Sequence, residues 1–238
     1  MADVENSMQL VIRQLSKVYP GGRGLLPVDL DVDRGEMVAV VGHNGAGKST
    51  LLKLLANWLV PANGAVTVEG VPLGDRLQLV RKVGFVPETP NLYELFSVEY
   101  NLAIFARLFG CDAARVEETL REFNLLPFRR SAVRTLSKGL KQRVSIGRTL
   151  LSDPPVLLLD EPTAALDFDM TAEMYRLIRR IHAKGKTVLF TSHRPEEVKS
   201  LATRILVLHQ GALVFDGVPD AYFQSDFHER LYTCSATS

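Results

Sequence analysis

The chain has 238 residues, of which 46% are hydrophobic and 23% are charged, a balance typical of a globular domain with a sizeable buried core. Its formal net charge is only +1, so the composition does not support bulk electrostatic binding of nucleic acid or of anionic lipid. The two cysteines, Cys111 and Cys234, lie in no CxxC or Cys/His cluster. We therefore expect reduced thiols in the cytosol and no structural zinc.

No segment approaches the roughly 18 uninterrupted apolar residues that a membrane-spanning helix needs. The first seven residues precede no apolar segment of the kind found in a secretory signal. We expect a soluble chain, whose membrane role would depend on a partner.

The first part of the chain predicts edge strands. Residues 1–36 and 62–70 contain turn signals at Gly21-Gly22 and Asn63-Gly64, and we expect a small antiparallel sheet there.

Short apolar runs rich in Val, Leu and Ile then alternate with helical patterns. The runs 37–41, 156–159, 187–190 and 205–208 predict strands buried on both faces of a mostly parallel sheet. Between two of them, Met174, Leu177, Ile178 and Ile181 follow the helical spacing. Gln210-Gly211 predicts a hairpin that leads into Ala212–Phe215. The alternation indicates an α/β fold.

Residues 90–150 depart from this alternation, because their pattern is mostly helical. We interpret the chain as a single domain over residues 1–225, with a core of about 1–88 and 155–225 and an inserted helical subdomain of about 89–154. Residues 226–238 would form a loosely ordered tail.

The segment Gly42-His43-Asn44-Gly45-Ala46-Gly47-Lys48-Ser49-Thr50 follows the apolar run 37–41 and precedes the helical run Leu51–Trp58. A P-loop requires this strand–loop–helix order. Glycines let backbone N–H groups close around phosphate oxygens, and the helix N-terminus adds partial positive charge. We predict nucleoside triphosphate binding, in which Lys48 contacts the β- and γ-phosphates and Ser49 ligates Mg²⁺. A glycine-rich turn that merely caps a helix is the alternative.

The apolar run Val156–Leu159 ends in the acidic pair Asp160-Glu161. Such a strand delivers its carboxylates to the C-terminal edge of a parallel sheet, beside the P-loop. We predict that Asp160 holds Mg²⁺ through water and that Glu161 polarises the attacking water. Two acids at a strand end can instead cap a helix or form surface ion pairs.

The segment Leu136-Ser137-Lys138-Gly139-Leu140-Lys141-Gln142-Arg143 predicts a helix start with Ser137 as its N-cap, which is a potential anion site. It resembles the signature motif of ABC ATPases, and it precedes the carboxylate pair at the spacing of that family. The resemblance extends from about residue 10 to residue 220. It implies a P-loop NTPase core with the two subdomains described above, and it implies that Ser137, Lys138 and Gly139 contact the γ-phosphate bound to a second copy.

Further residues match family positions. Tyr19 resembles the aromatic residue that stacks on adenine, although a strand-end tyrosine can instead pack on the core. The segment Glu161–Asp167 resembles the turn that links the two active sites of a dimer, so the resemblance implies a nucleotide-site role for Asp167. His193, after Thr191-Ser192, resembles the histidine that contacts the γ-phosphate. The implied catalytic set is Lys48, Glu161 and His193.

Three positions depart from the family pattern. Glu88 replaces the usual glutamine; a carboxylate can still ligate Mg²⁺, but it adds negative charge near the γ-phosphate. Lys138 replaces a glycine and Leu140 replaces a glutamine. The Lys138 side chain could point toward the phosphate of the second copy or toward solvent.

These departures resemble the exporter branch, which pairs with short six-helix permeases. The resemblance implies ATP and Mg²⁺ as ligands, a homodimer, and a polytopic membrane permease as partner, with no nucleic-acid partner. It places the protein at the cytoplasmic face of the inner membrane, held there by the permease. Tyr93–Phe105 would receive the permease's coupling helix, although some of its apolar residues must pack inside the helical lobe.

Two other functions were weighed. A soluble ABC ATPase in translation or DNA repair usually carries two cassettes or a long coiled coil, and 238 residues hold neither. A small-molecule P-loop kinase would explain residues 42–50 but neither Ser137–Arg143 nor Glu161.

Overall fold

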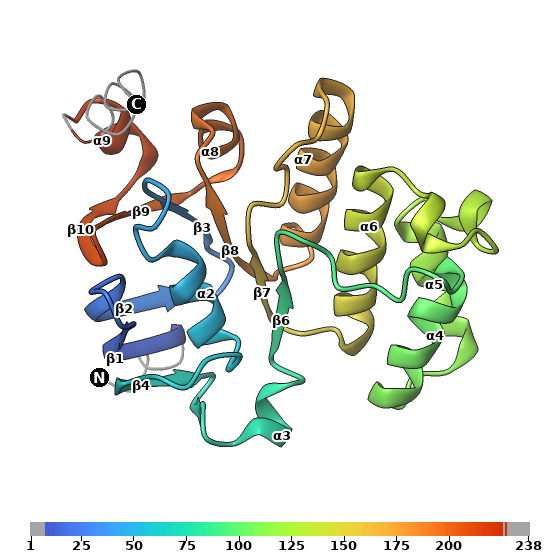
Figure 1. The fold of residues 1–238 in the computed structure, drawn as a ribbon, viewed down its shortest axis with the longest axis horizontal. Coiled ribbons are helices and arrows are strands. Elements are labelled where there is room, and N and C mark those ends of the chain that lie inside the picture. Colours follow the sequence, from blue (N-terminus) through green and yellow to red (C-terminus); the bar gives the residue numbers. More distant parts are fainter. Residues whose placement is uncertain (1–7, 226, 228–238) are drawn as a thin grey trace.

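Six strands form the central sheet, in the order β10-β9-β3-β8-β7-β6 (Figure 1). The computed structural model describes residues 8–225 and 227. Five strands are parallel, and only β10 runs antiparallel to its neighbour β9. The bounds are β3 (Met37–Val41), β6 (Val83–Val86), β7 (Val156–Leu159), β8 (Thr187–Ser192), β9 (Arg204–His209) and β10 (Ala212–Gly217). The predicted mostly parallel sheet is confirmed.

A second sheet is small and antiparallel, as predicted. Its order is β2-β1-β4-β5, with β1 (Met8–Val18), β2 (Gly24–Asp33), β4 (Asn63–Val68) and β5 (Val71–Pro72).

The prediction of a turn at Asn63-Gly64 is wrong, because both residues begin β4. They lie opposite a bulge in β1, where Gln14 has a φ of 50°. A Cβ at Gly64 would lie 2.3 Å from the carbonyl oxygen of Gln14. The glycine therefore permits the close approach of two strands and does not form a turn.

Helices cover both faces of the central sheet (Figure 1). They are α2 (Lys48–Leu55), α7 (Phe168–His182), α8 (Pro195–Leu201) and α9 (Pro219–Phe223), while the short α3 (Arg76–Leu79) contacts β5 of the small sheet. Helix α2 begins earlier than predicted and ends before Trp58. Asn57, with φ of 55°, breaks the helix and donates a side-chain hydrogen bond to Leu73 O at 2.8 Å.

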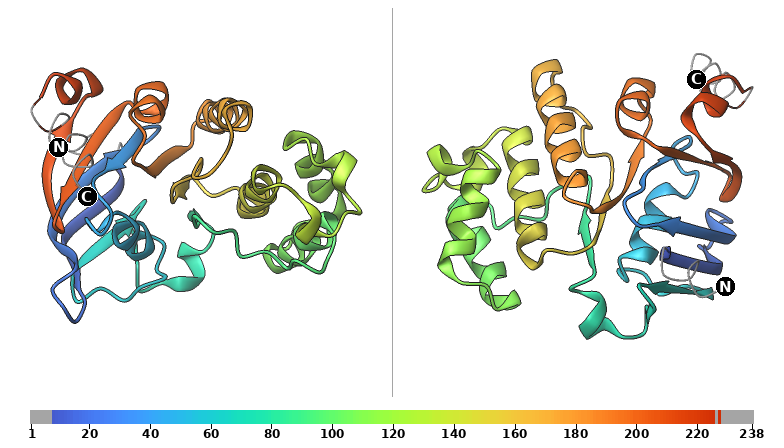
Figure 2. Two further views of the ribbon diagram at one scale, coloured as in Figure 1. Left: turned by 45° about the horizontal axis from the view of Figure 1, so that its top comes forward. Right: turned by 180° about the vertical axis from the view of Figure 1, so that it is seen from behind.

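The inserted region forms three helices, α4 (Val98–Phe109), α5 (Ala113–Glu122) and α6 (Lys138–Thr149). Two short 3₁₀ turns, η1 (Leu126–Phe128) and η2 (Val133–Thr135), lie between α5 and α6, and a third, η3 (Leu150–Ser152), follows α6. Figures 1 and 2 show these helices at the end of the molecule opposite the small sheet.

Successive side chains of β3 point to opposite faces of the central sheet, and the core is divided into two layers accordingly. Ala39 and Val41 pack with α7, α8 and the inserted helices, whereas Val38 and Val40 pack with α2 and the small sheet. Each face of the fully buried β3 thus contacts a different layer, as a doubly covered parallel strand requires.

The predicted hairpin joins β9 to β10 and precedes α9, and Gln210 and Gly211 both have positive φ in its turn. The tail, apart from residue 227, and Cys234 lie outside the described residues. In the described part of the chain, no helix is long and apolar enough to span a bilayer.

Candidate functional site

The loop 42–47 leaves β3 and turns sharply into α2. Gly42, with φ of 154°, lies so close to β9 that a Cβ would be 2.3 Å from Leu208 O. Gly47, with φ of 105°, would place a Cβ 2.6 Å from Gly24 O. Only glycine fits at these two contacts, and the resulting loop curls around the N-terminus of α2 as phosphate binding requires.

Lys48 is the first residue of α2 and is only 7% exposed. Its Nζ donates hydrogen bonds to Gly42 O at 2.7 Å and to His43 O at 3.1 Å. Burial lowers the pKa of the ammonium, and the carboxylates of Glu161 and Asp160 oppose that shift. The ammonium is held at the centre of the loop, where it can pair with an anion.

Asp160 follows β7 and is 4% exposed. Its Oδ1 accepts hydrogen bonds from Ser49 Oγ at 2.9 Å and from Thr191 Oγ1 at 2.8 Å. Ser49, which contacts Asp160, lines one cavity together with Glu88. Carboxylate and hydroxyl oxygens are the donors that Mg²⁺ prefers. These residues fit a magnesium site.

Glu161 adopts a left-handed conformation, with φ of 48°. Its backbone N–H donates to Thr191 Oγ1 at 2.8 Å, and its Oε2 lies 2.8 Å from His193 Nδ1. A non-glycine residue keeps such a φ only where its surroundings fix it, and such residues concentrate at functional sites. Thr191, which the sequence analysis did not single out, orients both acids.

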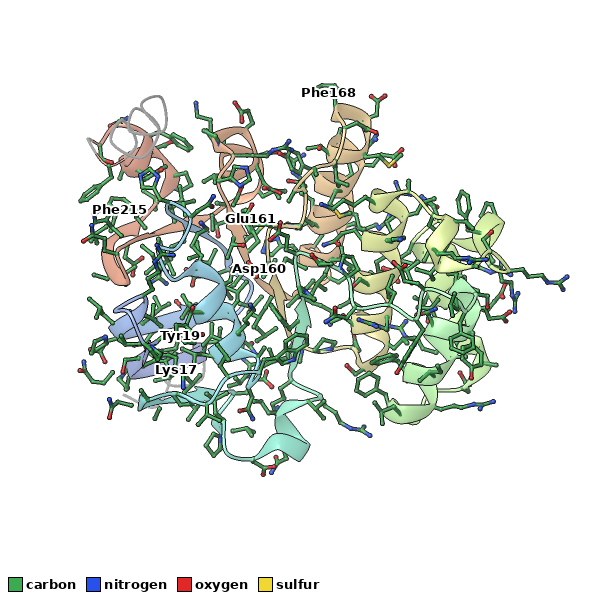
Figure 3. The ribbon with its side chains drawn as sticks, in the orientation of Figure 1. Lys17, Tyr19, Asp160, Glu161, Phe168 and Phe215 are labelled. Carbon is green, nitrogen blue, oxygen red and sulfur yellow. The ribbon has the colours of Figure 1, made fainter. Side chains whose placement is uncertain are left out.

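A cavity of about 230 Å³ brings these groups together. It is lined by residues 44–50 and by Tyr19, Arg23, Gly24, Glu88 and Glu161. Figure 3 shows Asp160 and Glu161 side by side near the centre of the molecule. Tyr19 is 37% exposed and lines the cavity, so it does not pack on the core. Arg23 and Gly24 were not predicted to lie here; their position depends on the β1–β2 turn.

Eight predicted residues do not line this cavity themselves. Four of them are hydrogen-bonded to residues that do: Gly42 and His43 to Lys48, Asp160 to Ser49, and His193 to Glu161. The other four lie away from it. Ser137 caps α6, since its Oγ accepts from Leu140 N at 3.3 Å, and Asp167 caps α7 by accepting from Met170 N at 2.8 Å. Gly139 is buried against Met170, whereas Lys138 is exposed. Within one copy of the chain, these four residues therefore lie apart from the cavity that the P-loop lines.

Glu197 forms a buried network that the sequence analysis missed. Its side chain is fully buried and accepts hydrogen bonds from Thr163 Oγ1 at 2.9 Å and from Ser192 Oγ at 2.6 Å. Burial raises the pKa of Glu197 from its usual 4.5 to about 7. The two hydroxyls oppose this rise, Glu161 adds to it, and Arg194 lowers the pKa.

Glu197 is expected to make stability depend on pH. Between about pH 4.5 and 7 the folded chain binds this proton more tightly than the unfolded chain, so the free energy of unfolding falls as pH rises. E197Q removes this dependence. As the pH rises from 4.5 to 7, the free energy of unfolding of E197Q minus that of wild type should therefore increase by up to roughly 3 kcal/mol, and it should be constant above pH 7. Urea unfolding at a series of pH values measures the difference; a constant difference would contradict the shifted pKa.

Comparison with known proteins gave several matches. A family model described as "ABC transporter" matches residues 25–164, and one described as "AAA domain, putative AbiEii toxin, Type IV TA system" matches residues 130–199. The chain is 34% identical to the ABC transporter ATP-binding protein NatA of Bacillus subtilis, over 86% of this chain and 85% of that protein. It is 38% identical to the Nod factor export ATP-binding protein I of Cupriavidus pinatubonensis, over 88% of this chain. It spans 66% of that relative, just under two thirds of its length.

Two solved structures have a similar fold. An ATP-binding subunit of an ABC transporter is 33% identical, with a TM-score of 0.82 and coverage of 94% of this chain and 98% of that one. CbiO1 from Clostridium perfringens, part of the ABC transporter complex CbiONQ, is 27% identical, with a TM-score of 0.82 and coverage of 94% of both chains. The first family model includes both the loop 42–47 and the acids at 160 and 161.

Proposed function

Because this chain belongs to the ABC transporter family, as an ATP-binding and ATP-hydrolysing subunit, we propose that Lys48, Glu161 and His193 are its catalytic residues. The observation that carries the assignment is that the P-loop and Glu161 line one cavity, while Asp160 is hydrogen-bonded to Ser49 and His193 contacts Glu161 at its edge. Glu161 is the general base, and its carboxylate lies on the cavity in contact with His193.

ATP would be held by residues of two kinds. The backbone of residues 42–47, with Ser49, Thr50 and the Lys48 ammonium, surrounds the phosphates, and Tyr19 offers a ring for the base. His43 and Asn44 belong to the same loop. When phosphate enters, the Lys48 hydrogen bonds to the loop carbonyls are exchanged for bonds to phosphate oxygens.

Ser49, Asp160 and Glu88 would hold Mg²⁺ with the nucleotide. The ion supplies neutralisation of charge on the phosphate oxygens. Asp160 is already oriented for this by Thr191 and Ser49. His193 Nδ1–H donates a hydrogen bond to the Glu161 carboxylate and so keeps that carboxylate directed at the cavity.

The four residues away from the cavity support a dimer of two copies. Ser137, Lys138 and Asp167 are exposed, and Gly139 places the start of α6 against the start of α7. We propose that this edge contacts the ATP bound to the second copy. The helical subdomain, about residues 89–154, would then carry the signature residues, and the core, about residues 1–88 and 155–225, the P-loop.

A membrane permease is the partner through which the subunit acts, and we propose export as the direction of transport. Glu88 and Lys138 support export, as does the relative that is named for Nod factor export. The subunit would be held at the cytoplasmic face of the inner membrane.

The permease would contact the surface at Tyr93–Phe105. Tyr93, Phe96 and Tyr100 are about half exposed and their rings pack in sequence, while Leu95 is 76% exposed. Leu102 is fully buried and belongs to the core instead. Beside this surface lies a cavity of about 500 Å³, lined by residues that include Trp58, Phe85, Phe105, Phe109 and Arg148.

Two measurements test the proposal. The purified chain should hydrolyse ATP in a Mg²⁺-dependent manner. A tagged copy should also recover one polytopic protein in stoichiometric amount from membranes solubilised in mild detergent. Recovery of ribosomes or DNA-repair proteins would instead support a soluble ABC ATPase.

Leu95→Glu is expected to weaken permease binding. A leucine buried at an interface contributes about 1.5–3 kcal/mol, so recovery of the polytopic partner should fall at least roughly tenfold. Leu108→Glu is the matched control, because Leu108 is 71% exposed but lies outside Tyr93–Phe105. Equal recovery with both variants would exclude Leu95 from the contact surface. Melting temperatures of the purified variants would verify that both fold.

A further inference from the structure

Glu197 is a buried carboxylate in α8 for which the mechanism above has no role. Its two oxygens accept hydrogen bonds from a turn residue and from the last residue of β8. Oε1 accepts from Thr163 at 2.9 Å and Oε2 accepts from Ser192 at 2.6 Å. Because an unpaired carboxylate at this depth would be costly, both contacts are needed to keep it there.

The two hydroxyls lie next to the proposed catalytic pair along the chain. Thr163 follows Glu161 by two residues, in a turn closed by a hydrogen bond from Ala164 N to Glu161 O at 3.1 Å. Ser192 directly precedes His193. Since Glu161 Oε2 contacts His193 Nδ1 at 2.8 Å, the chain and these hydrogen bonds close a ring that contains both catalytic side chains.

The hydrogen bonds have defined directions. Ser192 Oγ accepts from Arg194 N at 3.0 Å, so its own proton is directed to Glu197. Thr163 is 1% exposed and Ser192 is fully buried, so water does not replace Glu197 as their partner. A fully satisfied buried network of this kind makes the attached loops rigid.

We propose that Glu197 is a positioning residue for ATP hydrolysis, which holds the Glu161 turn and the His193 loop together through Thr163 and Ser192. The inference rests on the proposed roles of Glu161 and His193. Catalytic groups misplaced by about 1 Å can lose on the order of a hundredfold in rate, so the bridge affects kcat without contacting ATP.

The bridge requires two hydrogen bonds but no charge. In Glu197→Gln the amide oxygen accepts from Ser192 and the amide nitrogen donates to Thr163. In Glu197→Met a side chain of similar length makes neither bond. We expect the Met variant to lose roughly tenfold to a hundredfold in kcat with its KM for ATP within about twofold of wild type, and the Gln variant to retain at least about half of kcat.

The double variant Thr163→Val, Ser192→Ala removes the same hydrogen bonds from the other side. Adding Glu197→Met to it should cause no further loss of kcat, because groups that act as one unit are not additive. Thr119→Val controls for general destabilisation, since Thr119 is also buried and donates one hydrogen bond, to Arg115 O at 2.8 Å. It should lower the melting temperature while kcat is kept.

Three results would overturn the inference. They are an unchanged kcat in the Met variant, an equal loss in the Gln variant, or an equal loss in Thr119→Val at a similar melting temperature. Failure of the proposed function itself is distinguishable, because then Glu161→Gln would hydrolyse ATP at the wild-type rate whatever Glu197 does. Should the Met variant fold poorly, Ser192→Ala alone removes one arm of the bridge and gives the same test with a smaller loss.

Discussion

Glu161→Gln is expected to lower kcat for ATP hydrolysis by about 10²–10⁴-fold, the usual contribution of a general base. The amide keeps the size of the side chain but cannot accept a proton from water. Lys48 and the loop 42–47 are untouched, so ATP binding should be preserved. With hydrolysis blocked, ATP should stabilise the proposed dimer by its own binding energy.

The measurement combines steady-state hydrolysis with the mass of the protein in solution. The variant should be dimeric with ATP and monomeric without it, whereas wild type should return to monomer as ATP is consumed. Glu196→Gln is the matched control, because Glu196 is an exposed acid in the first turn of α8. A Glu161→Gln variant that hydrolyses ATP as fast as wild type would remove Glu161 from its role.

Local sequence was sufficient for the features that depend on neighbouring residues. The P-loop was recognisable because glycine spacing, the preceding strand and the following helix are all within about 20 residues. The N-cap role of Ser137 was predicted in the same way, and its Oγ does accept from Leu140 N. The Gln210-Gly211 hairpin is a third case, since glycine readily takes positive φ and often marks a tight turn between strands.

The position of Asp160 beside the P-loop was predicted from the order of parallel strands, but other contacts between distant parts of the chain were not. Glu197 appears in the sequence as one of two acids in a helix's first turn, which is ordinarily a solvated position. Only the packing of α8 against β3 and β8 buries it beside Thr163 and Ser192. Thr191 is similar, because its contacts with Asp160 and Glu161 join residues about 30 positions apart.

The remaining errors have local causes that pattern reading overlooks. Gly64 was interpreted as a turn because Asn-Gly commonly forms one, yet its role is to let β4 approach the bulge at Gln14. The α2 boundary was placed too late because Trp58 is apolar. Its ring in fact packs edge-on against Phe85, with 4.8 Å between centroids, after Asn57 has ended the helix.

Mixing two inactive variants tests whether each ATP site is shared between copies. Lys48→Ala should abolish phosphate binding in the chain that carries it. Ser137→Asp should keep the N-cap hydrogen bond, because aspartate caps helices well, but place a negative charge where the second copy's phosphate would approach. Each variant alone should lose at least about 10²-fold in kcat.

Equal amounts of the two variants should recover hydrolysis. In a mixed dimer, one site combines both defects, while the other combines an intact P-loop from the Ser137→Asp chain with an intact signature from the Lys48→Ala chain. Random mixing makes half of the dimers mixed, so activity should return to on the order of a quarter of the wild-type rate.

The control is a mixture of Lys48→Ala with Glu161→Gln. Lys48 and Glu161 line the same cavity of one chain, so every site in this mixture carries one of the two defects and no activity should return.

The exposed edge at Ser137 and Asp167, with Phe168 87% exposed at the start of α7 (Figure 3), is the surface that would meet the second copy. If neither mixture recovers activity, each site is either complete within one copy or requires both sites of the dimer to be intact. Lys48→Ala mixed with wild type separates these cases, since hydrolysis falls below half of the wild-type rate only when both sites must be intact.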